Sequence, residues 1–299
     1  MSLSDQPGVG IGLRILSGVF MAGMYVSVKA VSEDVPLGEI VFFRSFFALI
    51  PLVLFLWWRN EFPGGLATRR PFDHFLRSSF GALALFAAFA ALARLNIAEA
   101  ILIAQLSPML TAVAAVILLS ERLTVWRVAG LILGFSGVLM LVWPELGGGE
   151  LERTRLLGIA LGLASAALSA LALIMVRSLN KTESPGAIAL YFVLASMVGS
   201  MFTVPLGWVW AEGSTLLLLV SAGLFGGFAH IAMTLSFRYA EASRLAPFEY
   251  LALLWPLLAD LLIFRLPLST SFLLAAPLVL AGAAVAALEG TRRAAAQPD

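Results

Sequence analysis

The sequence is dominated by long apolar segments that are separated by short polar breaks. A helix of about 20 apolar residues crosses the hydrocarbon core of a bilayer, and these segments are close to that length. Only 12% of the residues are charged and 61% are hydrophobic, whereas a soluble domain carries about 25% charged residues. We therefore predict an all-α integral membrane protein with ten transmembrane helices, at residues 10–30, 37–57, 75–93, 97–119, 125–143, 156–176, 185–209, 214–237, 242–264 and 269–288.

The composition also excludes several kinds of functional site. The sequence has no cysteine, which excludes disulfides, thiolate metal sites and a cysteine nucleophile. The two histidines, His74 and His230, lack the spacing of metal ligands. We expect neither a metal nor a cofactor, and the net charge of +1 suggests no nucleic-acid partner. The first apolar segment has no early basic region before it and no convincing cleavage site after it, so we interpret it as a retained span.

The chain contains one stretch twice, at residues 94–124 and 238–268, and the two copies align without a gap. Each copy is a polar entry followed by a long apolar helix with a proline at mid-depth. Weak similarity between two halves, with interrupted helices at corresponding places, is typical of transporters built from repeats. A glycine-rich acidic break separates the halves near the middle of the chain. We predict five-helix repeats at residues 1–147 and 156–290, a linker at 148–155 and a tail at 291–299.

The lysine and arginine residues indicate how the helices are oriented. Most of them fall at breaks that lie on the same side of the membrane as the N-terminus. Cytoplasmic loops are enriched in these two residue types, so we expect both termini in the cytoplasm. Because each repeat has an odd number of helices, the second repeat is then inverted relative to the first.

Two polar residues, Gln105 and Glu249, occupy equivalent positions in the two copies. Each lies about seven residues inside its helix, or roughly 11 Å at 1.5 Å per residue. Polar groups at membrane depth are costly and mark functional positions. We expect both to face one cavity, with Glu249 meeting a substrate ammonium or a proton and Gln105 offering a neutral donor and acceptor. The alternative is a helix-to-helix hydrogen bond and an ion pair of Glu249 with Arg244 or Arg238.

His230 lies mid-span in the glycine-rich stretch GLFGGFAHIAM. Histidine titrates near neutrality, which allows a proton role in a cavity; ordinary hydrogen-bonded packing is the alternative. Aromatic and methionine side chains are expected to form an apolar wall for the substrate, with packing as the alternative for each. These candidates are Met21, Tyr25, Phe86, Phe89, Tyr250 and Trp255.

Arg44, about seven residues into the second span, is the deepest cation. We expect a structural ion pair with Glu39, Glu99 or Asp260; the alternative is capture of a substrate carboxylate by the forked guanidinium donors. Lys29, at the end of the first span, is expected to snorkel toward the interface. Prolines in the repeated helices free a carbonyl and bend the helix, so they are candidate gating hinges or static kinks. They are Pro108, Pro247 and Pro256.

Three stretches resemble EamA-type carriers of the drug/metabolite transporter superfamily: GMYVSVKAVSEDVPLGEIVFFRSFFAL, AEAILIAQLSPMLTAVAAVILLSERLTVWRVAGLILGFSGVLML and APFEYLALLWPLLADLLIFRLPL. The last one is most similar to the aromatic amino acid exporters of bacterial inner membranes. The resemblance implies a multi-pass inner-membrane carrier that exports amino acids, aromatic ones included, and related small metabolites by alternating access. We expect a monomer or homodimer, and coupling to protons stays open.

Other functions remain as alternatives. A carrier of this kind can also move nucleobases, nucleotide sugars or cationic drugs. An anionic substrate needs several cationic side chains in the cavity, and only Arg44 and Lys29 are candidates. A membrane-embedded enzyme is disfavoured because the sequence shows no paired aspartates in spans, no Ser-His pair and no H-E-x-x-H motif. ATP-driven pumping is not expected, since no nucleotide-binding loop is present.

Overall fold

The computed structural model describes residues 6–119, 124–147, 149–240, 245, 248 and 253–295. Every regular element in these residues is a helix, which confirms the predicted all-α class. Seven helical segments of the described part are long and apolar enough to cross a bilayer. They are Pro7–Val31, Leu37–Trp58, Pro71–Leu92, Ile97–Leu118, Val125–Gly147, Glu150–Leu179 and Gly213–Tyr239.

Several helices begin at a proline. Proline occupies the first turn of α1 (Pro7–Val31), α3 (Pro71–Leu92) and α8 (Pro185–Met201). Its missing N–H costs no hydrogen bond there, and its fixed φ angle suits a helix start. The other long helices are α2 (Leu37–Trp58), α6 (Val125–Val142), α7 (Glu150–Leu179), α9 (Gly213–Tyr239) and α12 (Thr270–Ala295).

The predicted span at 97–119 is interrupted in the structure. It consists of α4 (Ile97–Ala104) and α5 (Ser107–Leu119), with a break at Gln105 and Leu106. Pro108 lies in the first turn of α5, where no N–H is needed; inside one continuous helix its ring would clash with the carbonyl four residues earlier. Backbone groups freed at such a break are available to a substrate or to neighbouring side chains.

The matching segment of the second half is described only in part. Its described helix, α11 (Leu254–Leu262), has Pro256 in its first turn. The predicted hinge Pro247 lies outside the described residues. A gating role for any of the three prolines stays a prediction.

Two predicted boundaries differ from the structure. The span predicted to reach residue 209 ends at Met201, where α8 gives way to the short 3-10 helix η3 (Val204–Leu206). Pro205 explains the end, because its ring would clash with the carbonyl of Met201 in a continued helix. Gly207 then turns the chain with a φ of 95°, a left-handed conformation that glycine adopts at no steric cost.

The predicted linker at 148–155 is mostly helical. A 3-10 helix, η2 (Trp143–Gly147), continues from α6, and α7 starts at Glu150. Glu150 and Glu152 both lie in the first turn of α7, where their negative charge is favourable at the positive end of the helix dipole. Helix α7 therefore begins within the predicted linker.

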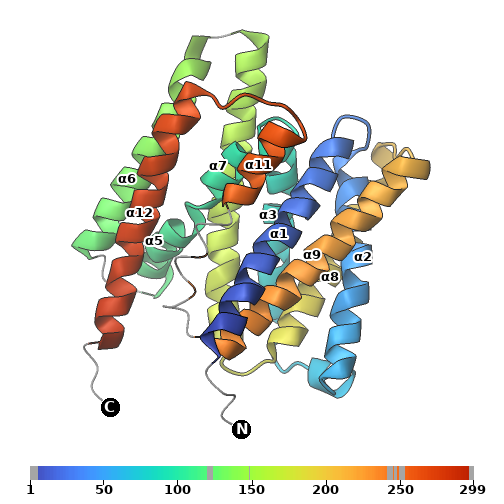
Figure 1. The fold of residues 1–299 in the computed structure, drawn as a ribbon. Coiled ribbons are helices and arrows are strands. Elements are labelled where there is room, and N and C mark those ends of the chain that lie inside the picture. Colours follow the sequence, from blue (N-terminus) through green and yellow to red (C-terminus); the bar gives the residue numbers. More distant parts are fainter. Residues whose placement is uncertain are drawn as a thin grey trace.

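The helices pack in pairs that bring distant parts of the chain together (Figure 1). α1 packs along α9, α3 packs along α7, and α6 packs along α12 at one edge of the molecule. α2 contacts both α9 and α8. The α6–α12 contact depends on glycine, because a Cβ atom at Gly282 would lie only 2.6 Å from the carbonyl oxygen of Gly130. Small residues at helix crossings let backbones approach closely in membrane proteins.

α1 begins and α12 ends at the same end of the molecule (Figure 1). We call this end the terminus side and the other end, where the turn between α1 and α2 and the start of α7 lie, the opposite side.

Candidate functional site

A central cavity of about 320 Å³ lies among the helices. We define it by its lining residues, which come from α1, α2, α3, α4, α7, α8 and α9. Most of its wall is apolar or aromatic, and the polar minority is the chemically informative part. The polar lining residues are Tyr25, Arg44, Arg77, Ser165, Ser169 and His230.

Arg44 projects from the middle of α2 into this cavity and is 2% exposed. Its Nε and Nη1 atoms have no hydrogen-bond partner among the described residues. The expected ion pair with Glu39, Glu99 or Asp260 is therefore absent from the described part of the structure. Burying a guanidinium without a partner costs free energy, so the absence of a carboxylate beside Arg44 needs an explanation.

The three carboxylates are engaged elsewhere. Glu39 accepts hydrogen bonds from the backbone N–H groups of Val209 and Ala211, at 2.8 and 2.9 Å. Asp260 accepts two from the N–H groups at the start of α4, at 3.1 and 2.7 Å. Glu99 pairs with Arg155, whose Nη2 lies 2.9 Å from Oε1. All three carboxylates are therefore engaged by backbone N–H groups or by Arg155, and none of them pairs with Arg44.

Arg77, which the sequence reasoning did not select, lies in the same cavity. Its Nε and Nη1 atoms also have no hydrogen-bond partner within the described residues. The guanidinium lies over the ring of Phe192, with 4.4 Å between Cζ and the ring centroid, which is a cation–π contact. The predicted span began at residue 75 and left Arg77 at its edge. Pro71 was the available signal, because a proline favours the first helical turn and would have placed Arg77 deeper.

His230 lies where two cavities meet. It lines the central cavity and also a small cavity of about 90 Å³, whose other lining residues include Arg59, Glu61 and Pro185. These residues belong to the loops and helix ends of the terminus side. The structure therefore places His230 between the central cavity and the terminus side, and its proton role stays a prediction.

Phe89 occupies the equivalent place toward the opposite side. It is 1% exposed and lines both the central cavity and a cavity of about 590 Å³. That second cavity also contains Asp34 and Arg94, from the turns of the opposite side. Phe89 thus lies between the two cavities. Met21 and Tyr25, two other predicted wall residues, also line the central cavity.

None of the other predicted site residues that the structure describes lines the central cavity. Phe86 lines a lateral groove of about 740 Å³ between α3 and α8 and not the central cavity. Trp255 is in the first turn of α11 and is absent from the lining of the described cavities. Gln105 lies at the α4–α5 break, next to the lining residue Ala104. Glu249 and Tyr250 lie outside the described residues, so the pairing of Gln105 with Glu249 stays a prediction.

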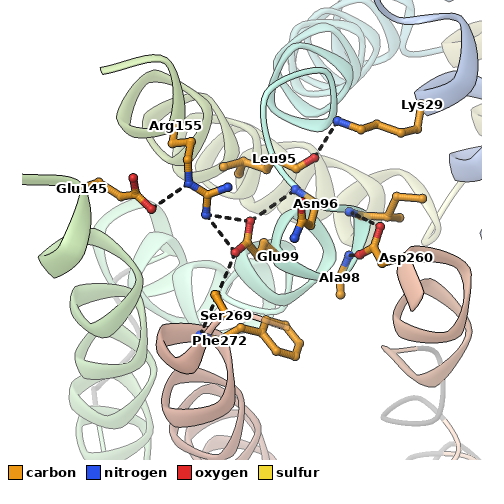
Figure 2. Close-up of polar contacts among 11 residues, drawn as sticks. Lys29, Leu95, Asn96, Ala98, Glu99, Glu145, Arg155, Asp260, Ser269 and Phe272 are labelled. Carbon is orange, nitrogen blue, oxygen red and sulfur yellow. Dashed lines mark hydrogen bonds and ion pairs between the residues drawn. The ribbon is translucent and has the colours of Figure 1, made fainter. Parts of the chain in front are cut away.

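Lys29 does not snorkel toward the interface as expected. Its Nζ donates hydrogen bonds to the carbonyl oxygens of Leu92 and Leu95, each at 2.9 Å; Figure 2 shows the bond to Leu95. Leu92 is the last residue of α3 and Leu95 lies three residues later. Unpaired carbonyl groups at a helix C-terminus carry the negative end of the helix dipole. A cation is favourable at such a helix end.

A polar cluster joins several helices on the opposite side (Figure 2). Arg155 of α7 connects Glu99 of α4 with Glu145 of η2, and its Nε lies 2.7 Å from Glu145 Oε1. Asp260 of α11 caps the start of α4, as described above. We call Lys29, Glu99, Glu145, Arg155 and Asp260 the opposite-side cluster. It ties α1, α4, α7 and α11 together at this end of the molecule.

The EamA-like transporter family matches residues 8–143. A riboflavin transporter of Rhizobium johnstonii is 27% identical over 271 residues, which cover 88% of this chain and 86% of the relative. A pseudopaline exporter of Pseudomonas aeruginosa is 28% identical over 255 residues, which cover 82% and 84%. An S-adenosylmethionine uptake transporter of Rickettsia felis is 28% identical over 262 residues, which cover 85% and 84%.

A solved crystal structure of a protein is also similar over almost the whole chain. The superposition covers 95% of this chain and 98% of the other, with a TM-score of 0.65 and 23% sequence identity. This likeness shows a shared fold. The relatives with names carry chemically different small molecules, so they do not select one substrate for this protein.

Proposed function

We propose that this protein is a membrane transporter that exports amphipathic metabolites, amino acids with aromatic side chains included, across a bacterial inner membrane. The match of residues 8–143 to the EamA-like transporter family and the similarity to named small-molecule transporters support this proposal. The observation that carries this proposal is the central cavity. Its volume of about 320 Å³ lies at the lower end of the roughly 300–1,000 Å³ of small-molecule sites. Its apolar wall with a few polar groups suits an amphipathic substrate.

We further propose that transport proceeds by alternating access between two inverted five-helix repeats. If α1 corresponds to α7, α2 to α8, α3 to α9 and α6 to α12, then the α1–α9 contact is equivalent to the α3–α7 contact. The α2–α9 and α3–α8 contacts are equivalent in the same way. This pattern of contacts supports an internal two-fold relation, and rocking of two such repeats around a fixed site is the usual mechanism in transporters built this way.

Two barriers on either side of the cavity support the same mechanism. Phe89 lies between the central cavity and the 590 Å³ cavity of the opposite side, where the opposite-side cluster also joins the helices, and His230 lies toward the terminus side. Alternating access requires that one barrier opens while the other stays closed. With both termini in the cytoplasm, the opposite side faces the exterior, and the opposite-side cluster is the external barrier.

The two arginines disfavour one of the alternatives. A cationic drug entering the central cavity would meet Arg44 and Arg77, and no aspartate or glutamate lines that cavity among the described residues. Like charges in a low-dielectric site repel strongly. Nucleobases, which are neutral, remain the second candidate substrates.

The test uses purified protein in liposomes and follows labelled phenylalanine, tryptophan and threonine, with and without an imposed pH gradient. We expect saturable flux of phenylalanine and tryptophan that excess unlabelled substrate abolishes. Acceleration by the gradient assigns proton coupling, with Glu249 and His230 as the first residues to replace. Absence of flux for all three amino acids, from protein that retains its helical content, would refute amino acid export and make nucleobases the next substrates to test.

A further inference from the structure

The central cavity contains two buried cations and, within the described residues, no carboxylate. Arg44 and Arg77 both line it, and in each of them Nε and Nη1 have no hydrogen-bond partner in the described part of the chain. The other polar lining residues are hydroxyl-bearing side chains and His230. Of these, Ser165 already donates to the carbonyl oxygen of Ala84, at 2.8 Å. The free donors of the cavity wall are therefore mainly guanidinium groups.

We propose that Arg44 and Arg77 together bind a carboxylate of the substrate, so that the transported molecules are amphipathic carboxylates or amino acids and not amines. This inference rests on the proposed function for the statement that the bound molecule is transported. Carboxylate binding itself is independent of it. Arginine presents a planar fork of donors that matches the two oxygens of a carboxylate.

The surroundings of Arg44 favour this role over a purely structural one. A Cβ atom at Gly226 of α9 would lie 3.3 Å from both Nε and Nη2 of Arg44, so the glycine gives the guanidinium space against the neighbouring helix. The carboxylates expected to pair with it bind backbone N–H groups or Arg155 instead; they are Glu39, Glu99 and Asp260. A buried arginine with a structural role is normally paired with a carboxylate. An arginine that binds a substrate anion has free donors until the substrate enters.

The guanidinium of Arg77 also lies beside a glycine, and beside an aromatic ring. A Cβ atom at Gly81, one turn further along α3, would clash with Nη1 of Arg77. Phe192 of α8 covers one face of the guanidinium. A guanidinium donates its hydrogen bonds within its own plane, so a cation–π contact on one face leaves its edge available to an anion. The glycine and the aromatic ring therefore fix the direction of the donors without satisfying them.

The charge balance of the cavity leads to the same conclusion. Two guanidinium groups, with no carboxylate among the described lining residues, raise the electrostatic potential of a small, mostly apolar space. An entering carboxylate lowers that energy and accepts charge-assisted hydrogen bonds, which contribute more than neutral ones. The apolar and aromatic wall, with Met21, Met24 and Phe89, then contacts the rest of the molecule.

The experiment compares four probes that share one phenyl group: 3-phenylpropionate, phenylalanine, phenylalanine amide and phenethylamine. Binding to the full-length protein in detergent is measured by ligand-induced change in melting temperature and in intrinsic tryptophan fluorescence. We expect the two carboxylates to bind at least about 10-fold more tightly than the amide and the amine, since hydrogen bonds to charged groups contribute about 1.5–3 kcal/mol each. Equal affinities for the four probes would overturn the proposal.

Variants assign the effect to the two arginines. Arg44→Gln and Arg77→Gln are each expected to weaken binding of 3-phenylpropionate about 10- to 100-fold. Neither variant is expected to weaken binding of phenethylamine, because each removes a charge that repels the ammonium group. Arg44→Lys and Arg77→Lys keep the charge but lose the fork, and are expected to fall between. Arg153→Gln, which removes an exposed arginine from α7, is the matched control and should bind like the wild type. Unchanged affinity in both glutamine variants would overturn the proposal, and the lysine variants decide the matter if a glutamine variant does not fold.

The two proposals fail in different ways. If liposomes show no flux of amino acids, while 3-phenylpropionate still binds and the glutamine variants lose it, export of amino acids is wrong and the carboxylate site stands. If amino acid flux persists while the carboxylate and amine probes bind alike, the carboxylate site is wrong and the transport function stands.

Discussion

The opposite-side cluster predicts that a single substitution, Arg155→Gln, shifts the protein toward a conformation that is open on the opposite side. Arg155 joins Glu99 of α4 to Glu145 of η2, with N–O distances of 2.9 and 2.7 Å. Glu99 also accepts a hydrogen bond from Ser269, just before α12, at 3.4 Å. Opening this side requires α4 to separate from α7, which breaks these contacts.

The magnitude follows from the burial of the partners. Removing one partner of a buried ion pair costs about 3–5 kcal/mol. The Arg155 side chain is 23% exposed, so water screens part of its interaction, and we expect about 2–3 kcal/mol. Because each 1.4 kcal/mol changes an equilibrium tenfold, the population that is open on the opposite side should rise roughly 30- to 150-fold.

The assay uses the absence of cysteine from the sequence. Ser169→Cys introduces a single thiol into the lining of the central cavity, and a membrane-impermeant thiol reagent is added from one side of oriented proteoliposomes at a time. Arg155→Gln should raise the labelling rate from the opposite side and lower it from the terminus side. Arg153→Gln, two residues earlier in the same helix and exposed, should leave both rates unchanged. Equal labelling of Arg155→Gln and the wild type from each side, in folded protein, would refute the view that the cluster keeps this side closed.

Four further predictions concern single residues. Phe89→Ala should join the central cavity to the 590 Å³ cavity on the opposite side and produce uncoupled leak of small solutes in liposomes, whereas Phe86→Ala, in the lateral groove, should not. Asp260→Ala leaves two N–H groups at the start of α4 without their acceptor and should destabilise the protein by about 2–5 kcal/mol, seen as a lower melting temperature; Asp260→Asn, which keeps one carbonyl oxygen, should lose less. Gly81→Ala should displace the Arg77 guanidinium and weaken 3-phenylpropionate binding as Arg77→Gln does, while Gly12→Ala, where a Cβ atom meets nothing within 4 Å, should bind normally. In the loop before α8, desolvation raises the pKa of Glu183, but the neighbouring Thr68 side chain, the Arg69 amide and the His74 side chain outweigh this effect and lower the pKa. The stabilisation is present above the unfolded-state pKa of about 4.3 and is lost as the pH falls through the lower folded-state pKa. Between about pH 6 and pH 3 the melting temperature should therefore fall more in the wild type than in Glu183→Gln.

The positions of the membrane helices could be predicted from the sequence because they depend on local properties. The predicted second span, at residues 37–57, starts at the first residue of α2 and ends one residue before its last. The break at Gln105 follows from Pro108, since the missing N–H and the ring clash act within one turn. The end of α8 was missed although Pro205 was visible, because the apolar run continues past it and hydropathy alone does not register a helix end.

The site could be predicted only in part because its chemistry depends on contacts between distant residues. Glu39 lies only five residues before Arg44 on α2, yet it binds the amides of Val209 and Ala211, about 170 residues away. Asp260 likewise caps α4 across more than 160 residues. The partners are backbone N–H groups, which every residue except proline has, so the sequence gives no signal of which segment will bind each carboxylate.

Phe86 and Phe89 show the same limit on a single helix. They are three residues apart on α3, which places them about 60° apart around the helix axis, and both were expected to face the substrate. Phe89 lines the central cavity, and Phe86 lines the lateral groove between α3 and α8. The direction of each depends on which neighbours α3 meets, namely α7 and α8. Those neighbours come from the other half of the chain, so the cavity wall exists only once the two halves have assembled, and a substitution that separates the halves should abolish binding even when it lies far from Arg44 and Arg77.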